Sequence, residues 1–416
     1  MEMPPRLRVF ILLAILVFVA HVIVSVYAAD RLTKVLDRDA PIESRFAPSF
    51  AAAVCALPLL DLSFLNDIVF ALLVAFVLTF FRWHTIVSLI ILVPLLLLGG
   101  MFFTALWLEN RVQRGWNELA PQAIIDAPMG DLVSPLGKES FDPVTSYLAK
   151  EIARGDDRID PEPQEVDWFF VAHREDIDKL RERVPGTNDP LALFRMQKIL
   201  LVDALQNRSW DDVLAARRIS EKMLHQPYHQ SVLFAMAATE NQLGVIRKLN
   251  PPLHPTLPSF DPHRQLIDAI AAQEARLTTI APPWYSQPYA RLCLAESADS
   301  ALRQAMLIEN LRGCSFASPA DFEFKPRVPF NPTGVLNGGF RYAIRANRLL
   351  LDLEGTSYIL AVKGGGQPPT AVRCIDRHWI LEGDTLRLDP PLPAAAPFLP
   401  TRHEISAASP ASRSSS

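Results

Sequence analysis

The sequence lacks the short motifs that mark common catalytic and metal centres. Its 416 residues contain no G-x-S-x-G, no H-E-x-x-H, no Walker phosphate loop and no C-x-x-C pair. Nucleophile elbows, zinc proteases, phosphate loops and thiol redox pairs therefore have no support. A Ser or Cys nucleophile is still compatible with the sequence, because its partners need not lie near it along the chain. The catalytic residues, if the protein has any, are unknown from the sequence.

Cysteine is also scarce, which excludes a disulfide scaffold. Of the four cysteines, Cys55 lies in an apolar segment, so Cys293, Cys314 and Cys374 allow one bridge and one leftover thiol. In an oxidising compartment Cys293 with Cys314 is the candidate pair, because the two bracket one predicted helix. The alternative is that they are inert buried thiols. No Cys or His spacing predicts a metal site, and no cofactor is implied.

An excess of basic charge is absent as well. Residues 1–107 hold seven basic and seven acidic side chains, so the net charge of −4 falls on the rest of the chain. This balance excludes a nucleic-acid surface on compositional grounds, and the acidic bias disfavours anionic partners.

Long apolar runs, in contrast, are prominent. Residues 66–108 contain two of them, which meet at Arg82-Trp83-His84, and neither carries a charge between 68 and 81 or between 85 and 108. A helix needs roughly 20 such residues to cross about 30 Å of hydrocarbon. We therefore predict a membrane hairpin with transmembrane helices at about 67–82 and 85–108.

A third apolar run follows Arg6 and Arg8, at residues 9–29. It is longer than a signal-peptide core, so an uncleaved anchor is favoured over a signal peptide cleaved after Val26-Tyr27-Ala28. Residues 47–65 are apolar but interrupted by two prolines and an aspartate, and they form either a re-entrant segment or a fourth span. With three crossings the large C-terminal part is extracytoplasmic. With four it is cytoplasmic. We expect three, in a bacterial inner membrane.

After the membrane domain, 1–108, the sequence predicts a linker at 109–160 and a helical domain at 161–313. Proline breaks and helix caps separate successive apolar periodicities; the caps include Asn188 or Asp189 before Pro190, and Ser209 before Trp210. Helices are expected at 165–184, 191–207, 210–226, 230–249, 262–280 and 287–312. The second and third of these are similar to one tetratricopeptide-type hairpin, but no copy recurs at a fixed period, so we predict a bundle or hairpin domain rather than a repeat array.

The pattern changes after Cys314. Residues 314–389 predict a small antiparallel sheet domain, and residues 390–416, rich in Pro, Ala and Ser, predict a disordered tail. Strands are expected at 340–345, 349–353, 358–362, 372–375, 379–381 and 385–388. The predicted fold is thus a membrane protein with three, possibly four, N-terminal transmembrane helices, a mainly helical domain and a small C-terminal sheet.

A resemblance covers residues 301–354. A helix is followed by Val328-Pro329-Phe330-Asn331-Pro332 and then by Gly339-Phe340-Arg341-Tyr342. This order resembles the C-terminal half of pseudopilin-like modules in bacterial envelope proteins, where a segment of the form V-P-x-D-P-F precedes an aromatic-basic-tyrosine strand. The acidic residue of that segment is absent here. The resemblance implies an envelope location and assigns no functional residue.

Three weaker motifs each have a structural alternative. His225 and His229 are four residues apart, as in some metal sites, but Pro227 is expected to break their helix. His173 adjoins a charged helix face, where solvation is favoured over acid–base work. Gly364-Gly365-Gly366 precedes prolines rather than a helix start, which favours a hairpin turn over a phosphate cradle.

The function predicted from these features is that of a membrane-anchored, non-enzymatic protein whose extracytoplasmic helical domain binds a protein partner in envelope assembly or secretion. Its partners are the lipid bilayer and a protein, with no nucleic acid. Two alternatives stay open: an envelope enzyme with a cleft between the helical and sheet parts, and an accessory subunit of a transporter.

Overall fold

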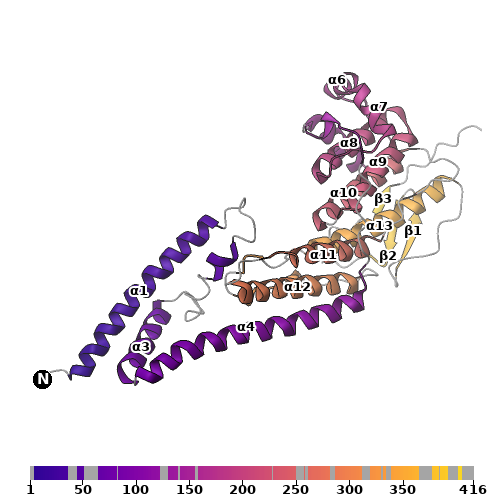
Figure 1. Ribbon diagram of the computed structural model, residues 1–416. Helices are drawn as coiled ribbons and strands as arrows, with labels where there is room; N and C mark the ends of the chain where they lie inside the picture. The colour runs from indigo at the N-terminus through magenta and orange to yellow at the C-terminus, as the bar shows by residue number, and fades with distance from the viewer. Residues whose placement is uncertain are drawn as a thin grey trace, which may run out of the picture. The chain divides into compact units, whose positions relative to one another are not determined.

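The computed structural model describes residues 4–35, 45–50, 64–81, 83–121, 130–138, 141–154, 158–226, 228–249, 257, 261–281, 286–311, 319–328, 331–333, 339–364, 377–383, 385–391 and 402–404 (Figure 1). Its contacts divide the chain into two units. The first combines residues 1–120, 274–303 and 324–337, and the second combines residues 121–273, 304–323 and 338–416.

Three apolar helices begin the first unit, α1 (Pro5–Val35), α3 (Phe64–Phe80) and α4 (Trp83–Leu119). By length and composition, two described helical stretches could cross a membrane: Pro5–Ile23 in α1 and Ile86–Leu119 in α4. In α3 the apolar stretch, Ala71–Phe80, is shorter. Residues 45–50 are helical, and the rest of the predicted segment 47–65 lies outside the described residues except for its end in α3. Helices therefore occupy all three predicted spans.

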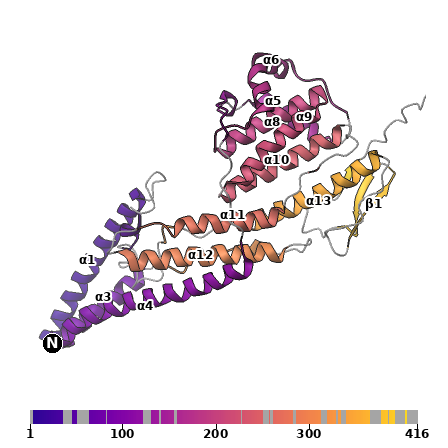
Figure 2. The ribbon, with the colours of Figure 1, turned by 45° about the vertical axis from the view of Figure 1, so that its right-hand side comes forward.

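The helix α12 (Gln287–Asn310) runs alongside the C-terminal part of α4 (Figure 2). Ala295 packs on Ala105 and Leu108 of α4, and one to two turns further along Ala298 and Leu302 pack on Val112. The predicted helix at 287–312 is confirmed, and it stacks on a helix that the sequence assigned partly to the membrane.

Two ion pairs join the same two helices. Arg291 donates from Nε to Glu109 Oε1 (2.6 Å) and from Nη2 to Glu109 Oε2 (2.5 Å), a bidentate geometry. Further along, Arg111 Nη2 pairs with Asp299, whose other oxygen is 3.0 Å from Arg303 Nη2. Apolar packing and charge pairing thus alternate along the contact between α4 and α12.

The second unit is a helical stack. Its helices are α5 (Asp142–Ala153), α6 (Gln164–Ala172), α7 (Arg174–Glu182), α8 (Pro190–Asn207), α9 (Trp210–Leu224), α10 (His229–Lys248) and α13 (Gly339–Lys363), with α11 (Pro262–Leu277) ending in the first unit. The helices α8 and α9 form the hairpin that the sequence predicts, and α10 packs on both. Of the two candidate caps before Pro190, Asp189 caps α8, and Ser209 caps α9 as predicted: they accept hydrogen bonds from the N–H groups of Leu191 (3.0 Å) and Asp212 (3.3 Å).

Two helical expectations need correction. The single helix predicted at 165–184 is broken at His173, whose backbone leaves the helical region (φ −113°, ψ 17°) and whose ring packs on Phe169. The break contains no proline or glycine, so the helical spacing of apolar residues in the sequence continues across it. Residues 142–153, inside the range assigned to a linker, form α5, which buries Val144, Tyr147 and Leu148.

The strands predicted at 340–345, 349–353 and 358–362 are wrong, because these residues form α13. Its buried positions include Ala343, Ala346 and Leu353, at helical spacings, while the apolar alternation that suggests strands is local. Residues 354–356, which separate two of the predicted strands, lie inside the helix and are buried. Arg247 of α10 fixes this face, since its Nη1 donates to Asp352 Oδ1 and Thr356 Oγ1 (2.7 Å each).

A small antiparallel sheet, of strand order β1-β2-β3, closes the second unit. The strands β1 (His378–Glu382) and β2 (Thr385–Asp389) confirm the expectations at 379–381 and 385–388, and 372–375 lies outside the described residues. Within the predicted disordered tail, β3 (Arg402–Glu404) pairs with β2, so that prediction is wrong for these three residues. Trp379 joins the sheet to α13 through a hydrogen bond from Nε1 to Glu354 Oε1 (3.0 Å).

Candidate functional site

Cys293 is a free, buried thiol in α12. Burial raises its pKa to about 12, and a hydrogen bond links its side chain to that of Tyr289. A thiol with so high a pKa carries almost no thiolate at neutral pH, so it is a poor nucleophile. Cys314 lies outside the described residues, and its pairing with Cys293 stays a prediction.

A loop packs over this thiol and uses the carboxylate of Glu296. Glu296 Oε1 accepts hydrogen bonds from the backbone N–H groups of Arg327 and Val328 (3.0 Å for Val328). Asn331 Nδ2 donates to Glu296 Oε2 (2.9 Å) and to the Cys293 carbonyl (3.2 Å). The carboxylate is therefore engaged in holding the loop, which indicates a structural role.

The predicted histidine motifs are also engaged in packing. His229 starts α10, with Nδ1 2.5 Å from Gln273 Oε1 and its ring on that of Tyr342, whereas His225 caps the end of α9. Among the described residues, no group of three or more His, Cys, Asp or Glu side chains could hold a metal ion. Gly364 directly follows α13, and the two glycines after it lie outside the described residues.

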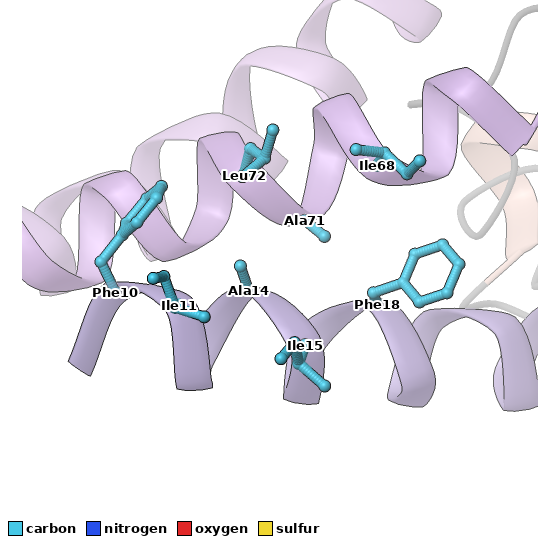
Figure 3. Close-up of a pocket in the computed structure, with 8 residues that line it drawn as sticks. All are labelled: Phe10, Ile11, Ala14, Ile15, Phe18, Ile68, Ala71 and Leu72. Carbon is cyan, nitrogen blue, oxygen red and sulfur yellow. The ribbon is translucent and has the colours of Figure 1, made fainter. Parts of the chain in front are cut away.

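One hollow lies between α1 and α3 and is wholly apolar (Figure 3). It measures about 290 Å³, and its lining consists of Phe10, Ile11, Ala14, Ile15, Phe18, Ile68, Ala71 and Leu72. Without a polar group this hollow can neither orient nor transform a substrate. It belongs to the contact between two membrane-type helices.

A second hollow, in the second unit, combines apolar and charged walls. It measures about 520 Å³, which is within the range of ligand sites. We call it the α8 groove. Its lining consists of Leu132, Val133, Ser134, Gly137, Lys138, Pro185, Gly186, Thr187, Asp189, Ala192, Arg195 and Met196.

The first wall of the α8 groove forms where two extended segments cross. Leu132 and Pro185 make a parallel bridge, and Gly186 N donates to the Leu132 carbonyl (2.8 Å). A Cβ on Gly130 would lie 2.3 Å from the Pro185 carbonyl oxygen, so this crossing requires glycine. Lys222 of α9 also stabilises this crossing, because its Nζ donates to the Pro185 carbonyl (2.6 Å). Burial lowers the pKa of this lysine.

The opposite wall is the start of α8 with the short 3-10 helix η1 (Pro135–Gly137). These two helices pack closely: a Cβ on Gly137 of η1 would lie only 2.9 Å from Ala192 Cβ of α8. Ser134 Oγ caps η1 by accepting from Leu136 N (3.3 Å). Arg195 Nη1 donates to the carbonyls of Gly137 (3.3 Å) and Lys138 (3.4 Å), which fixes the guanidinium at the groove.

The charged side chains of this wall are mainly cationic. Neither Lys138 nor Arg195 forms an ion pair with an acidic residue that the structure describes. One turn beyond Arg195, Lys198 Nζ lies 4.4 Å from the centre of the Phe194 ring, and burial, together with the nearby Arg195 charge, lowers the pKa of Lys198. Asp189 is the acidic residue of the lining, and it caps α8.

Apolar side chains are exposed at the groove. Val133 is 92% exposed, and Leu191, in the first turn of α8, is 41% exposed. An isolated exposed apolar residue is ordinary, but these two flank a hollow that also has cationic groups. This combination suits the binding of a segment with both apolar and anionic side chains.

Sequence reasoning singled out only the cap Asp189 among these residues. The groove joins residues 132–138, inside the predicted linker, to residues 185–196 of the helical domain. The paired glycines Gly130 and Gly186, which allow two backbones to approach, are the signal that could have pointed to it.

No protein-family model, no curated protein and no solved structure matches this chain, so the α8 groove is interpreted from its own geometry.

Proposed function

We propose that this protein is a membrane-anchored, non-enzymatic docking protein of a bacterial inner membrane. In this proposal three helices, at about 9–29, 67–82 and 85–108, cross the bilayer, and the extracytoplasmic helical domain binds a protein partner in envelope assembly or secretion. The observation that carries it is α4, whose first half exposes apolar side chains and whose second half bears the ion pairs with α12.

The anchoring half of the proposal rests on exposed apolar surface. Large apolar side chains that are more than half exposed occur on all three helices, and they include Leu12, Ile15, Leu73, Leu96 and Phe103. In water such a surface costs about 25 cal/mol for each Å² of apolar area. A hydrocarbon environment removes that cost, which is why three long helices with this exposure support a membrane location.

The docking half rests on the α8 groove. Of its two described hydroxyls, Ser134 Oγ caps η1 and Thr187 Oγ1 accepts a hydrogen bond from Asp189 N (3.1 Å), and its carboxylate, Asp189, caps α8. The groups that are free to meet a ligand are the cations and the exposed apolar side chains. This set can bind and orient a segment, but it contains no nucleophile beside a base, so binding is favoured over catalysis.

Reporter fusions test the anchoring half. Alkaline phosphatase or green fluorescent protein is fused after Asp39 and after Ser416. Three crossings predict active phosphatase at both sites, and fluorescence at Ser416 would instead require a fourth crossing and would overturn the extracytoplasmic placement. Extraction of the full chain from vesicles by alkaline carbonate would overturn the anchor itself.

Site-specific photocrosslinking tests the docking half. A photoreactive amino acid replaces the exposed Val133 in one strain and the exposed Arg341 of α13 in a second, matched strain. The proposal predicts a discrete crosslinked protein for Val133 that is absent for Arg341. Identical adduct patterns at the two positions would contradict a docking role for the groove.

A further inference from the structure

We infer that the α8 groove recognises an acidic, extended peptide segment of the partner protein. Carboxylates of the segment would meet Lys138 and Arg195, and apolar side chains between them would lie against Leu132, Ala192 and Met196. This inference deepens the proposed function and rests on it, since it names the chemistry of the partner.

The first support is charge complementarity. Lys138 and Arg195 line the groove and Lys198 lies one turn beyond Arg195 in α8, and no described acidic residue forms an ion pair with any of them. Arg181, elsewhere in the second unit, instead pairs with Asp203 and Asp212. Charges separated by more than about 10 Å are largely screened, so the local positive charge outweighs the acidic balance of the chain as a whole.

The second support is the mixed chemistry of the walls. A free phosphate or a simple anion would need cations and backbone N–H groups alone, but this groove adds Leu132, Pro185, Ala192 and Met196. A volume of about 520 Å³ has room for more than a single anionic group. A peptide that carries carboxylates and apolar side chains in turn uses both kinds of wall.

The third support is the form of the groove. One wall is the extended segment that bridges to Pro185, and its neighbouring residue Val133 is almost fully exposed. Arg195 is held by two carbonyls at the opposite wall, so a bound carboxylate meets a guanidinium whose orientation is already fixed. Alternate side chains of an extended peptide point to opposite sides, which suits two unlike walls.

The test measures binding to the full-length protein in neutral detergent. The probe is a short fluorescent peptide that alternates Glu with Leu, and its control is the same peptide with Gln in place of Glu. Fluorescence anisotropy should show that the Glu peptide binds at least about tenfold more tightly, and that added salt weakens it, as expected for charge pairing. Equal binding of the Gln peptide would overturn the inference.

Charge-reversal variants then test whether the peptide binds in the α8 groove. The double variant Lys138→Glu/Arg195→Glu should weaken Glu-peptide binding by about tenfold or more. Arg341→Glu, which reverses an exposed cation of α13, should leave it unchanged. Arg195→Gln keeps donors for the carbonyls of Gly137 and Lys138, so it reports on charge if the double variant does not fold. Binding that survives Arg195→Gln and the double variant, or falls equally in Arg341→Glu, would refute the groove assignment.

Two further arms separate the sources of negative charge. Inorganic phosphate that displaces the Glu peptide at equal concentration would show a simple anion site, and phosphatidylglycerol vesicles that bind in its place in a groove-dependent way would show a membrane-facing surface. Either result overturns the peptide inference. If the Val133 crosslink persists while the groove variants bind normally, only the ligand chemistry fails and the docking function stands.

Discussion

At the scale of single residues, Glu296 has the most interactions of the described carboxylates in the first unit. One oxygen accepts two backbone N–H groups and the other accepts the amide of Asn331. Hydrogen bonds to a charged acceptor each contribute about 1.5–3 kcal/mol when they are buried. Glu296 therefore fixes Arg327, Val328 and Asn331 against α12.

We expect Glu296→Ala to lower the free energy of unfolding by about 3 kcal/mol or more, because two N–H groups and an amide lose their acceptor. Glu296→Gln should cost less, since one amide oxygen can still accept from Arg327 and Val328. Thermal unfolding in detergent measures both. Glu118→Ala, an exposed carboxylate of α4 without an ion pair, is the control, and equal melting temperatures for Glu296→Ala and Glu118→Ala would contradict this role.

Glu274, near the end of α11, predicts a pH dependence. Burial raises its pKa from 4.5 to about 7, and its Oε1 has no hydrogen-bond partner among the described residues. The folded state therefore binds this proton more tightly than the unfolded state. Stability from this group is full below pH 4.5 and is lost as the pH rises through 7, by about 3 kcal/mol.

Glu274→Gln should remove this dependence. The difference in unfolding free energy between wild type and variant should change by about 3 kcal/mol between pH 4.5 and pH 7.5, with the wild type weakening as the pH rises. Chemical denaturation at a series of pH values measures it. Parallel pH profiles for the two proteins would show that the carboxyl is already solvated in the native state.

Local chemistry made some residues predictable and others not. The caps Asp189 and Ser209 follow from the preference of helix N-termini for short polar side chains, and both act as expected. The cations of the α8 groove do not stand out, because Lys138 and Arg195 are ordinary surface residues until η1 folds onto α8. What distinguishes them is that no acidic residue among the described ones forms an ion pair with them, which a short stretch of sequence does not show.

At the scale of elements, the contact between α4 and α12 depends on Gly115. A Cβ at this position would lie 2.4 Å from Leu302 Cδ2 and 3.0 Å from Leu302 Cδ1. Interatomic contacts of this length do not occur, so a larger side chain must displace Leu302 or separate the two helices. Gly100, in the same helix, has no neighbour within 4 Å of its Cβ position.

We expect Gly115→Leu to destabilise the first unit by about 1–3 kcal/mol through overpacking. Gly100→Leu should be neutral or stabilising, because leucine favours a helix over glycine by up to about 1 kcal/mol. Thermal unfolding compares them, and hydrogen exchange in residues 287–303 should rise only for Gly115→Leu. Equal behaviour of the two variants would mean that α12 does not pack at residue 115.

The elements also show where periodicity misleads. In α13 the pairs Ala346-Asn347 and Gly355-Thr356 have turn chemistry, yet they lie inside one helix because its face packs on α10 and the sheet. At His173 the opposite error occurs: the sequence has a continuous helical pattern and no proline there, yet the helix is broken. In both places tertiary packing determines the backbone conformation, because helix propensity contributes only a few tenths of a kcal/mol per residue.

At the scale of the whole molecule, composition predicted where the apolar helices lie along the chain. The apolar helices α1, α3 and α4 fall where long uncharged runs predict them, because a run of that length has few alternatives. The grouping of residues 274–303 and 324–337 with the apolar helices α1, α3 and α4 was not predictable, since it depends on pairs such as Arg291 with Glu109, which are 182 residues apart.

The continuity of α4 has a mechanical consequence. Its 37 residues extend over about 55 Å, whereas a hydrocarbon layer is about 30 Å thick, so in the proposed membrane location roughly half of a straight helix would protrude from the bilayer. Because α12 is clamped to that protruding half, any tilt that a thinner or thicker bilayer imposes on α4 swings α12 through the same angle. Lipid composition would then set the orientation of α12 relative to the bilayer.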